Sequence, residues 1–447
     1  MTAPAPPRRR ASRRDAAAGA LRAAGTPAIL RLLLAGLIAA SLVWGGLAAW
    51  AIGQHAAAAS EVVSSSEPLS LDAQQMYQSL SDADVTATTA FLAGPPEPLA
   101  VRQHYQADIA RAAADLAALR SAGGSAGSGD GRLAAGLAAV SAGLPVYAGY
   151  VSQAQDYGSL GYPLTGGSFM QVASEEMHLT LLPAARAIYA QENAALMASS
   201  ARATGLPWLV IVAAIALGIG YALLRTQRWL TRRTHRTVNY GLLAATLAAA
   251  VGLIWLFAAF AAARSDLGRG IGHGSAPAEL LARADIAAQQ ARGDEVLNLI
   301  SRSGSTSFQA DFLSERNKIG PGSGTLLDLA ATESPSGAGA AAVAAAQHDA
   351  PAWYSATGRV FRLDVAAHYA DETRLVLGTG AGSSAAGFAR LQRDLRRGLA
   401  ADQVVFRSGA SAGSGAFGGL EAGLAVAALI MAGGSAWGLS RRLAEYR

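Results

Sequence analysis

The sequence predicts an all-α fold, in which four transmembrane helices connect two extracytoplasmic four-helix bundles. Three observations carry this prediction. Four long apolar stretches contain no charged residue, namely 32–52, 206–224, 241–263 and 422–439. Each is close to the ~20 apolar residues that a helix needs to cross a bilayer. Arginines gather in the short segments beside these stretches, and the two long segments between them are rich in alanine and leucine.

The predicted elements follow one another along the chain. A basic cytoplasmic tail (1–28) leads into transmembrane helix 29–53 and a first extracytoplasmic helical bundle (54–205). Transmembrane helices 206–224 and 240–263 flank a basic cytoplasmic loop (225–239). A second extracytoplasmic bundle (264–417) leads into transmembrane helix 418–439 and a short cytoplasmic tail (440–447).

Positive charge sets the predicted orientation, because arginine beside a span resists translocation. Segment 1–28 has six arginines against one acid, segment 225–239 has five against none, and segment 440–447 has three against one. With four spans these segments share one face, so we expect a multi-pass cell-membrane protein with both termini in the cytoplasm. The first span is expected to be an uncleaved anchor; a signal peptide cleaved near 56–59 is the alternative.

The basic excess does not indicate a nucleic-acid partner. Block 54–205 holds 6 basic and 13 acidic residues and block 264–417 holds 15 of each, so the basic excess behind the net charge of +5 lies in the segments beside the spans. We interpret these arginines as setting topology and attracting anionic membrane lipid. The chain has no cysteine and therefore no disulfides, so each bundle must be stabilised by its own core.

Apolar residues in the first block recur at helical spacing. Met76, Leu80 and Ala87 belong to one predicted seam, and Met170, Met177 and Leu181 belong to another. Gly- and Pro-rich breaks divide this block into helices at about 56–93, 98–121, 131–157 and 168–204.

The second block divides in the same way, at about 264–302, 306–332, 340–372 and 385–407. The glycine-rich segment 408–419 after it predicts a softer joint before the last span. We interpret the two blocks as a tandem duplication, with chance similarity between alanine-rich segments as the alternative.

No constellation of residues indicates catalysis, a metal or a cofactor. The seven histidines are scattered, and none is paired at the helical spacing of metal ligands. We therefore expect no enzyme and no bound cofactor. A transporter or channel would show more spans and charges within them, and a surface-anchored enzyme would need a visible site.

Two groups of residues are candidate contact sites. Arg228, Arg232, Arg233 and Arg236 lie in the only cytoplasmic loop tied to spans at both ends, and are expected to contact an acidic partner; the alternative is topology setting with lipid contact. In the second block, Trp353, Tyr354 and Arg359, with neighbouring His348 and Arg362, are expected to contact a ligand or partner. An ordinary helix packed on the bundle is the alternative there.

Two stretches carry a resemblance to a known family. They are 76–92, with the sequence MYQSLSDADVTATTAFL, and 105–110, with the sequence YQADIA. With the layout of four spans and two helical domains, they resemble the GlnX-type membrane proteins of actinobacteria. The resemblance covers the full length by layout but only these stretches by residue, and it carries over no functional residue.

The resemblance implies a role in signal transduction. GlnX-type proteins link a glutamine-binding-type lipoprotein outside the membrane to the soluble Ser/Thr kinase PknG inside, with amino-acid availability as the input. The resemblance thus implies a membrane sensor with these two partners. A non-signalling scaffold of the cell envelope remains the alternative.

Overall fold

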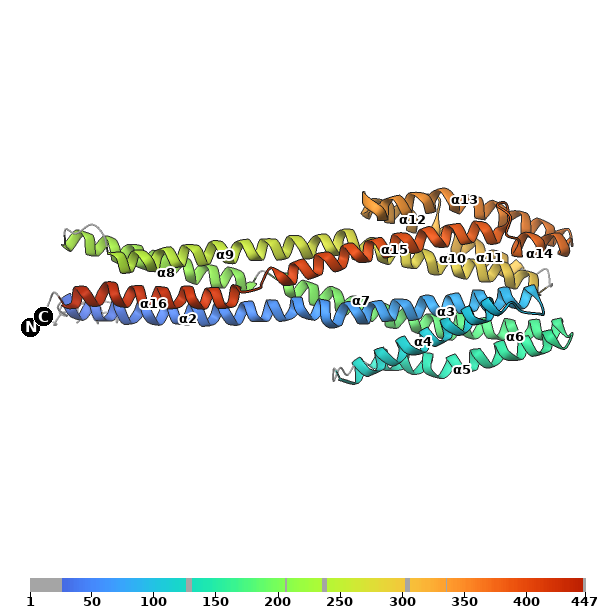
Figure 1. The fold of residues 1–447 in the computed structure, drawn as a ribbon, viewed down its shortest axis with the longest axis horizontal. Coiled ribbons are helices and arrows are strands. Elements are labelled where there is room, and N and C mark those ends of the chain that lie inside the picture. Colours follow the sequence, from blue (N-terminus) through green and yellow to red (C-terminus); the bar gives the residue numbers. More distant parts are fainter. Residues whose placement is uncertain are drawn as a thin grey trace, which may run out of the picture. The chain divides into compact units, whose positions relative to one another are not determined.

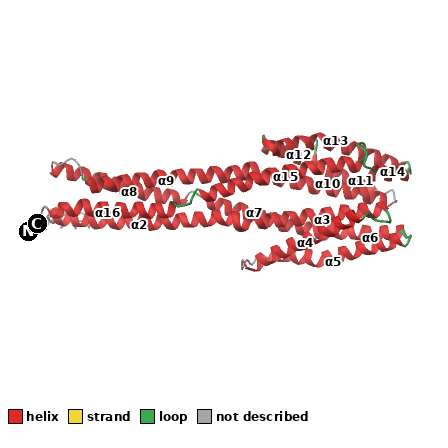
Figure 2. Cartoon of the chain, viewed as in Figure 1, coloured by secondary structure: helices red, strands yellow, loops and turns green. Residues whose placement is uncertain are grey.

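A computed structural model describes residues 26–125, 131–205, 207–234, 239–301, 306–334 and 336–444. Every regular element in these ranges is a helix, as Figure 2 shows. The all-α prediction is therefore confirmed for the part of the chain that is described.

The helices are distributed along the chain as follows (Figure 1). Up to the basic loop they are α2 (Thr26–Glu61), η1 (Val62–Ser66), α3 (Glu67–Ala93), α4 (Leu99–Ser125), α5 (Gly131–Ser159), α6 (Pro163–Glu176), η2 (Met177–Leu181), α7 (Leu182–Thr204) and α8 (Pro207–Thr234). After it come α9 (Tyr240–Gly270), η3 (Ile271–Ser275), α10 (Ala276–Ser301), α11 (Thr306–Ile319), α12 (Leu326–Glu333), α13 (Gly337–Val365), α14 (Tyr369–Leu377), α15 (Ser384–Gly415) and α16 (Leu420–Ala444). The three η elements are π-helical turns.

The chain divides into two compact units. The apolar unit comprises Met1–Ala57, Ala203–Arg264 and Ser414–Arg447. The two-block unit comprises Ala58–Arg202, the first block, and Ser265–Gly413, the second block. The structure therefore joins both blocks in one unit.

Close helix packing and exposed apolar side chains characterise the apolar unit. A Cβ on Gly241 of α9 would lie 2.5 Å from the carbonyl oxygen of Gly434 of α16, so these backbones are in direct contact. The indole Nε1 of Trp44 donates to the carbonyl oxygen of Val212 at 3.0 Å. Large apolar side chains such as Ile254 remain exposed. This combination fits helices surrounded by lipid.

Five helical stretches are long and apolar enough to cross a membrane. They are Arg31–Ala93, Gly131–Ser159, Pro163–Trp229, Tyr240–Ser301 and Ser384–Arg441. Four of them contain the predicted transmembrane segments. The fifth is α5, which lies in the two-block unit, where Val140 and Tyr147 are fully buried in a core. Several apolar helices thus fit a membrane protein.

One hydrophobic core holds the first block. It draws side chains from α3, α4, α5 and the run α6–η2–α7, and Ile286 of α10 joins it. Met76 and Leu80 of one predicted seam and Met170 and Met177 of the other are fully buried in it. The helical spacing of these residues therefore identified the faces that pack together.

A second core lies mainly in the second block, among α10, α11, α12, α13 and α15, and Val85 of α3 joins it. The prediction of one helix over 306–332 is wrong, because the chain turns between α11 and α12 at Gly320-Pro321. There Gly320 has a φ of 135° and Pro321 has no N–H to continue the helix.

The single helix predicted over 340–372 is also divided, into α13 and α14. Ala367 adopts a φ of 57°, and the backbone N–H of His368 donates to the carbonyl oxygen of Leu363. This bond closes the end of α13, in the way that a left-handed residue commonly ends a helix.

The glycine-rich joint predicted over 408–419 is only partly present. Helix α15 continues through Gly409 to Gly415, and the break follows at 416–419. A Cβ on Gly409 would lie 2.7 Å from the Cα of Gly270, so this glycine permits close packing on α9 rather than ending the helix.

Helices α3 and α10 pack against each other and join the two blocks. Both follow a π-helical turn, η1 before α3 and η3 before α10. From Ala284 to Leu299 nearly every residue of α10 is buried. Six of these buried residues are charged or carry an amide: Asp285, Gln289, Arg292, Asp294, Glu295 and Asn298. The centre of the two-block unit is therefore helical, buried and polar.

Candidate functional site

Arg396 of α15 connects the two blocks electrostatically. Its Nη2 lies 3.1 Å from Oδ2 of Asp82 on α3, and its Nε lies 3.6 Å from Oδ2 of Asp285 on α10. Asp285 is almost fully buried. Burial raises the pKa of the Asp285 carboxyl to about 6, and the guanidinium of Arg396 opposes that rise. One cation thus serves two carboxylates from different blocks.

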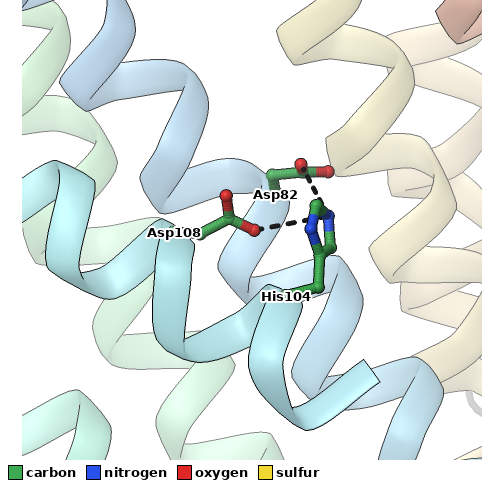
Figure 3. A group of neighbouring side chains, drawn as sticks. All are labelled: Asp82, His104 and Asp108. Atoms are coloured by element: carbon green, nitrogen blue, oxygen red, sulfur yellow. Dashed lines mark ion pairs between the residues drawn. The ribbon is translucent and has the colours of Figure 1, made fainter. Parts of the chain in front are cut away.

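Asp82 also belongs to a group on the first block that Figure 3 shows with His104 and Asp108 of α4. Nε2 of His104 lies 3.3 Å from Oδ2 of Asp82 and 3.5 Å from Oδ2 of Asp108. The ligand atoms of the three residues lie within 4.8 Å of one another. Imidazole nitrogen and carboxylate oxygen are suitable ligands for a transition metal, so these residues could hold one.

Two guanidinium groups compete for the same carboxylates. Arg396 pairs with Asp82, and Nη1 of Arg111 lies 3.1 Å from Oδ1 of Asp108. Burial raises the pKa of Asp108 to about 6, the charge of Asp82 adds to the rise, and His104 and Arg111 oppose it. The residues present therefore already form a charge network between α3, α4 and α15. A cavity of about 310 Å³ adjoins it, lined by Gln75, Gln78, Ser79, Asp82, Asp108, Arg111 and Arg396.

A second polar network lies inside the second block. Nη1 of the buried Arg292 lies 2.5 Å from Oε2 of Glu295, and its Nη2 donates to the carbonyl oxygen of Val376 at 2.8 Å. The hydroxyl of Ser384 donates to the same Glu295 oxygen at 2.7 Å. This network fastens α14 and the start of α15 to α10.

Glu372 of α14 is fully buried close to that network. Neither of its carboxylate oxygens has a hydrogen-bond partner among the described residues. Burial raises its pKa to about 7, and the charges of Asp364 and Glu295 act in the same direction. The residue is therefore substantially protonated near neutral pH.

The arginines of the predicted cytoplasmic contact lie at the end of α8. Arg228 and Arg232 are exposed there. Arg236 lies outside the described residues, and so does the side chain of Arg233. Partner contact by this group stays a prediction.

The predicted group in the second block is divided between the core and the surface. Trp353 is fully buried, and its Nε1 donates to the hydroxyl of Ser384 at 3.2 Å. Tyr354 is mostly buried, with the guanidinium of Arg316 5.1 Å from its ring centre. Arg359 is exposed and donates to the carbonyl oxygen of Gly382 at 2.6 Å. Trp353 therefore packs the core, and ligand contact by this group stays a prediction.

The charged residues at the block interface were not predicted as a site. Asp82 and Asp84 are two residues apart on α3 and therefore face different directions. Asp82 meets His104 and Arg396, whereas Asp84 lies 3.4 Å from Nε2 of His178. Asp84 lies four residues after Leu80 and three before Ala87, so an acid on the predicted apolar seam was the available signal. The partners of both acids come from distant segments and could not be read from spacing.

Comparison with known proteins gives one match. Residues 58–201 match the family model described as Actinobacterial sensor domain. The matched segment coincides with the first block, Ala58–Arg202, and covers less than half of the chain. No curated protein and no solved structure matches this chain. The match supports an actinobacterial sensor protein.

Proposed function

We propose that this protein is a transmembrane signal-transduction protein. It relays the availability of extracytoplasmic amino acids, through a solute-binding lipoprotein of the glutamine-binding type, to the cytoplasmic Ser/Thr kinase PknG. The single observation that carries the sensing role is the match of residues 58–201 to a sensor domain. The amino-acid input and the two partners rest on the resemblance of segments 76–92 and 105–110.

The proposed topology has four spans, both termini in the cytoplasm, and both blocks outside as four-helix bundles. The arginine-rich segments beside the apolar stretches support the orientation. The two hydrophobic cores, one built mainly from the first block and the other mainly from the second, support the bundles. The burial of α5 within the first core supports counting four spans and not five.

Exposed apolar residues on the first block provide a surface for the lipoprotein. Leu160, Tyr162 and Leu164 lie where α5 turns into α6, and each is between 61% and 70% exposed. Clustered exposed apolar residues, tyrosine among them, are typical of protein-binding surfaces. The same surface would serve a non-signalling envelope scaffold, which is the second candidate function.

Continuous helix offers a route for the signal. Residues 26–93 are helical throughout, from α2 through η1 to α3. A contact that shifts α3 can therefore be passed along the same helix as a small displacement. In the cytoplasm, the exposed Arg228 and Arg232, with Arg233 and Arg236, would dock an acidic surface of the kinase.

The test changes Arg232, Arg233 and Arg236 together to glutamine and retains Arg228 to preserve orientation. Amino-acid-dependent phosphorylation by the kinase should be lost, while the amount of protein in the membrane is unchanged. The matched control changes Arg8, Arg9 and Arg10 of the N-terminal tail to glutamine and should keep the response. Normal phosphorylation in the loop variant would exclude this loop as the output contact.

Purification from membranes separates the two candidate functions. A sensor should bring down a lipoprotein and a kinase, which lie on opposite faces. Recovery of envelope proteins alone, with no kinase under any amino-acid supply, would favour the scaffold.

A further inference from the structure

An acid-lined pocket lies between the two blocks, apart from the network around Arg396. It has a volume of about 530 Å³ and is formed by α6 and η2 of the first block and by α10 and α11 of the second. Its lining includes Ser174, Glu175, His178, Asp294, Asp311 and Glu315. Its size is in the range of small-molecule sites.

Asp294 of α10 is the unusual residue of this pocket. Its side chain lines the pocket, yet the residue is only 5% exposed and forms no hydrogen bond or ion pair with the described residues. Burial raises the pKa of its carboxyl to about 8; His178 opposes the rise, and the charges of Asp311, Glu315 and Asp84 add to it. A buried acid without a partner among the described residues is costly in its charged form, and a cation that reached it through the pocket would relieve that cost.

Among the described residues, the positive group that acts on Asp294 is His178, and it is already engaged. Nε2 of His178 lies 3.4 Å from Oδ2 of Asp84, whose same oxygen accepts a hydrogen bond from Ser174 at 2.8 Å. Burial lowers the pKa of His178, but the hydrogen bond and charge of Asp84, together with the charges of Asp294 and Glu315, raise it overall. His178 is thus paired directly with Asp84 and acts on Asp294 only through its charge.

The remaining charges of the pocket are negative. Glu315 pairs with Lys318, whereas Glu175 and Asp311 are exposed at the rim without such a pair among the described residues. The pocket thus combines a buried carboxyl with two acidic rim residues, and no described arginine or lysine lines it.

We propose that this pocket binds a small organic cation, with Asp294 as the counter-ion of its ammonium group. Asp311 and Glu175 attract the ligand at the rim, Gln290 offers an amide oxygen, and Leu297 and Phe308 contact its hydrocarbon part. This inference deepens the proposed function and rests on it, because the ligand is a sensory input only if the protein is a sensor. Since the pocket is lined by both blocks, a bound ligand would favour their packed arrangement.

A metal ion is a poorer fit than an ammonium. The described residues bring three metal-ligating atoms within 4.8 Å of one another at Asp82, His104 and Asp108, and not around Asp294. A compact divalent ion needs several oxygens close together. An ammonium on a flexible chain can instead approach one buried carboxylate and leave the others at longer range.

Binding should depend on pH in a defined direction. Without ligand, Asp294 keeps its proton at neutral pH, and an ammonium requires the charged carboxylate. The groups that face it are His178, Asp84, Asp311 and Glu315. Affinity should therefore rise between pH 6 and pH 8, with release of a proton on binding.

The test uses the full-length protein in nanodiscs of phosphatidylcholine, a lipid without net charge, with putrescine as the probe. Thermal unfolding and calorimetry should show saturable binding, at least tenfold tighter at pH 8 than at pH 6. Asp294→Asn, which keeps the shape, should weaken binding at least tenfold. Asp311→Asn at the rim should weaken putrescine binding about threefold. This second variant tests the inference if Asp294→Asn does not fold. The matched control Asp371→Asn removes an exposed acid elsewhere and should bind as the wild type does.

Three outcomes would overturn the inference: no saturable binding of putrescine, equal binding by Asp294→Asn, or saturation by Mg²⁺ but not by putrescine. The kinase is absent from this experiment. A negative result would therefore reject the pocket without rejecting the relay, and failure of the relay in cells would leave the binding result standing.

Discussion

Buried carboxylates on α3 and α10 are stabilised in different ways. Asp82 and Asp285 share the guanidinium of Arg396, and Asp84 has His178 and Ser174. Asp294 has no such partner among the described residues, and its raised pKa keeps it neutral. Removing a partner from a buried charge is costly, whereas removing an unpartnered charge relieves a cost. Substitutions at these positions should therefore have opposite effects.

Asp294→Asn should stabilise the ligand-free protein by roughly 2 kcal/mol at pH 8. The carboxyl ionises near its ordinary value of 3.8 when the chain is unfolded, but keeps its proton until about pH 8 when it is folded. The folded state binds more protons over this window, so its stability falls as the pH rises through it. Thermal unfolding in detergent should show that the variant loses less stability between pH 6 and pH 8 than the wild type does. An unchanged pH dependence, with Asp371→Asn as the control, would contradict this.

Arg396→Ala should destabilise the two-block unit by about 2 kcal/mol, because Asp82 and Asp285 lose their shared cation. The control is Arg397→Ala, which removes a mostly exposed arginine paired only within its helix and should cost under about 0.5 kcal/mol. Thermal unfolding of both variants provides the comparison. Equal stability of the two variants would show that Arg396 does not hold the blocks together.

At the scale of elements, close backbone contact fixes η3 against α15. A Cβ on Gly274 would lie 2.5 Å from the backbone nitrogen of Phe406, whereas a Cβ on Gly272 would meet nothing within 4 Å. These two glycines belong to the same π-helical turn. Only one of them is therefore required by packing.

Gly274→Ala should cost about 1–3 kcal/mol, because the added methyl group must push α15 away from η3. Gly272→Ala should be neutral or slightly stabilising, since alanine favours helix over glycine. Differential scanning calorimetry of the two variants measures the contrast. If Gly274→Ala left the stability unchanged, the close packing of η3 on α15 would not contribute to the stability of the protein.

Helices with regular apolar spacing were predictable from the sequence, and the ends of some were not. The seams at Met76 and Met177 identified core faces because burial follows the helical period. The turn at Ala367 has no glycine or proline to mark it, and this exposed alanine adopts a left-handed conformation that alanine rarely adopts. The candidate site was less predictable, because Arg396 and Asp82 lie 314 positions apart and only the fold brings them together.

At the scale of the whole molecule, two blocks of one chain form a single unit around α3 and α10. The sensor-domain match covers only the first block. The second block contains the same pair of elements as the first, a π-helical turn followed by a long buried helix. It also supplies Arg396 and Asp294 to the interface between the blocks. The proposed sensory state is therefore a property of both blocks together.

The proposed function depends most on sidedness: both blocks on the extracytoplasmic side of the membrane, and the end of α8 in the cytoplasm. The chain has no cysteine, so single cysteines report on sidedness directly. Ser168, Ser355 and Thr231 are exposed in the first block, the second block and α8, respectively. Each is changed to cysteine, and intact cells are treated with a membrane-impermeant maleimide. We expect the cysteines at positions 168 and 355 to be labelled in intact cells, and the cysteine at position 231 to be labelled only after permeabilisation. Labelling at position 231 in intact cells, or labelling of one block but not the other, would contradict the proposed topology.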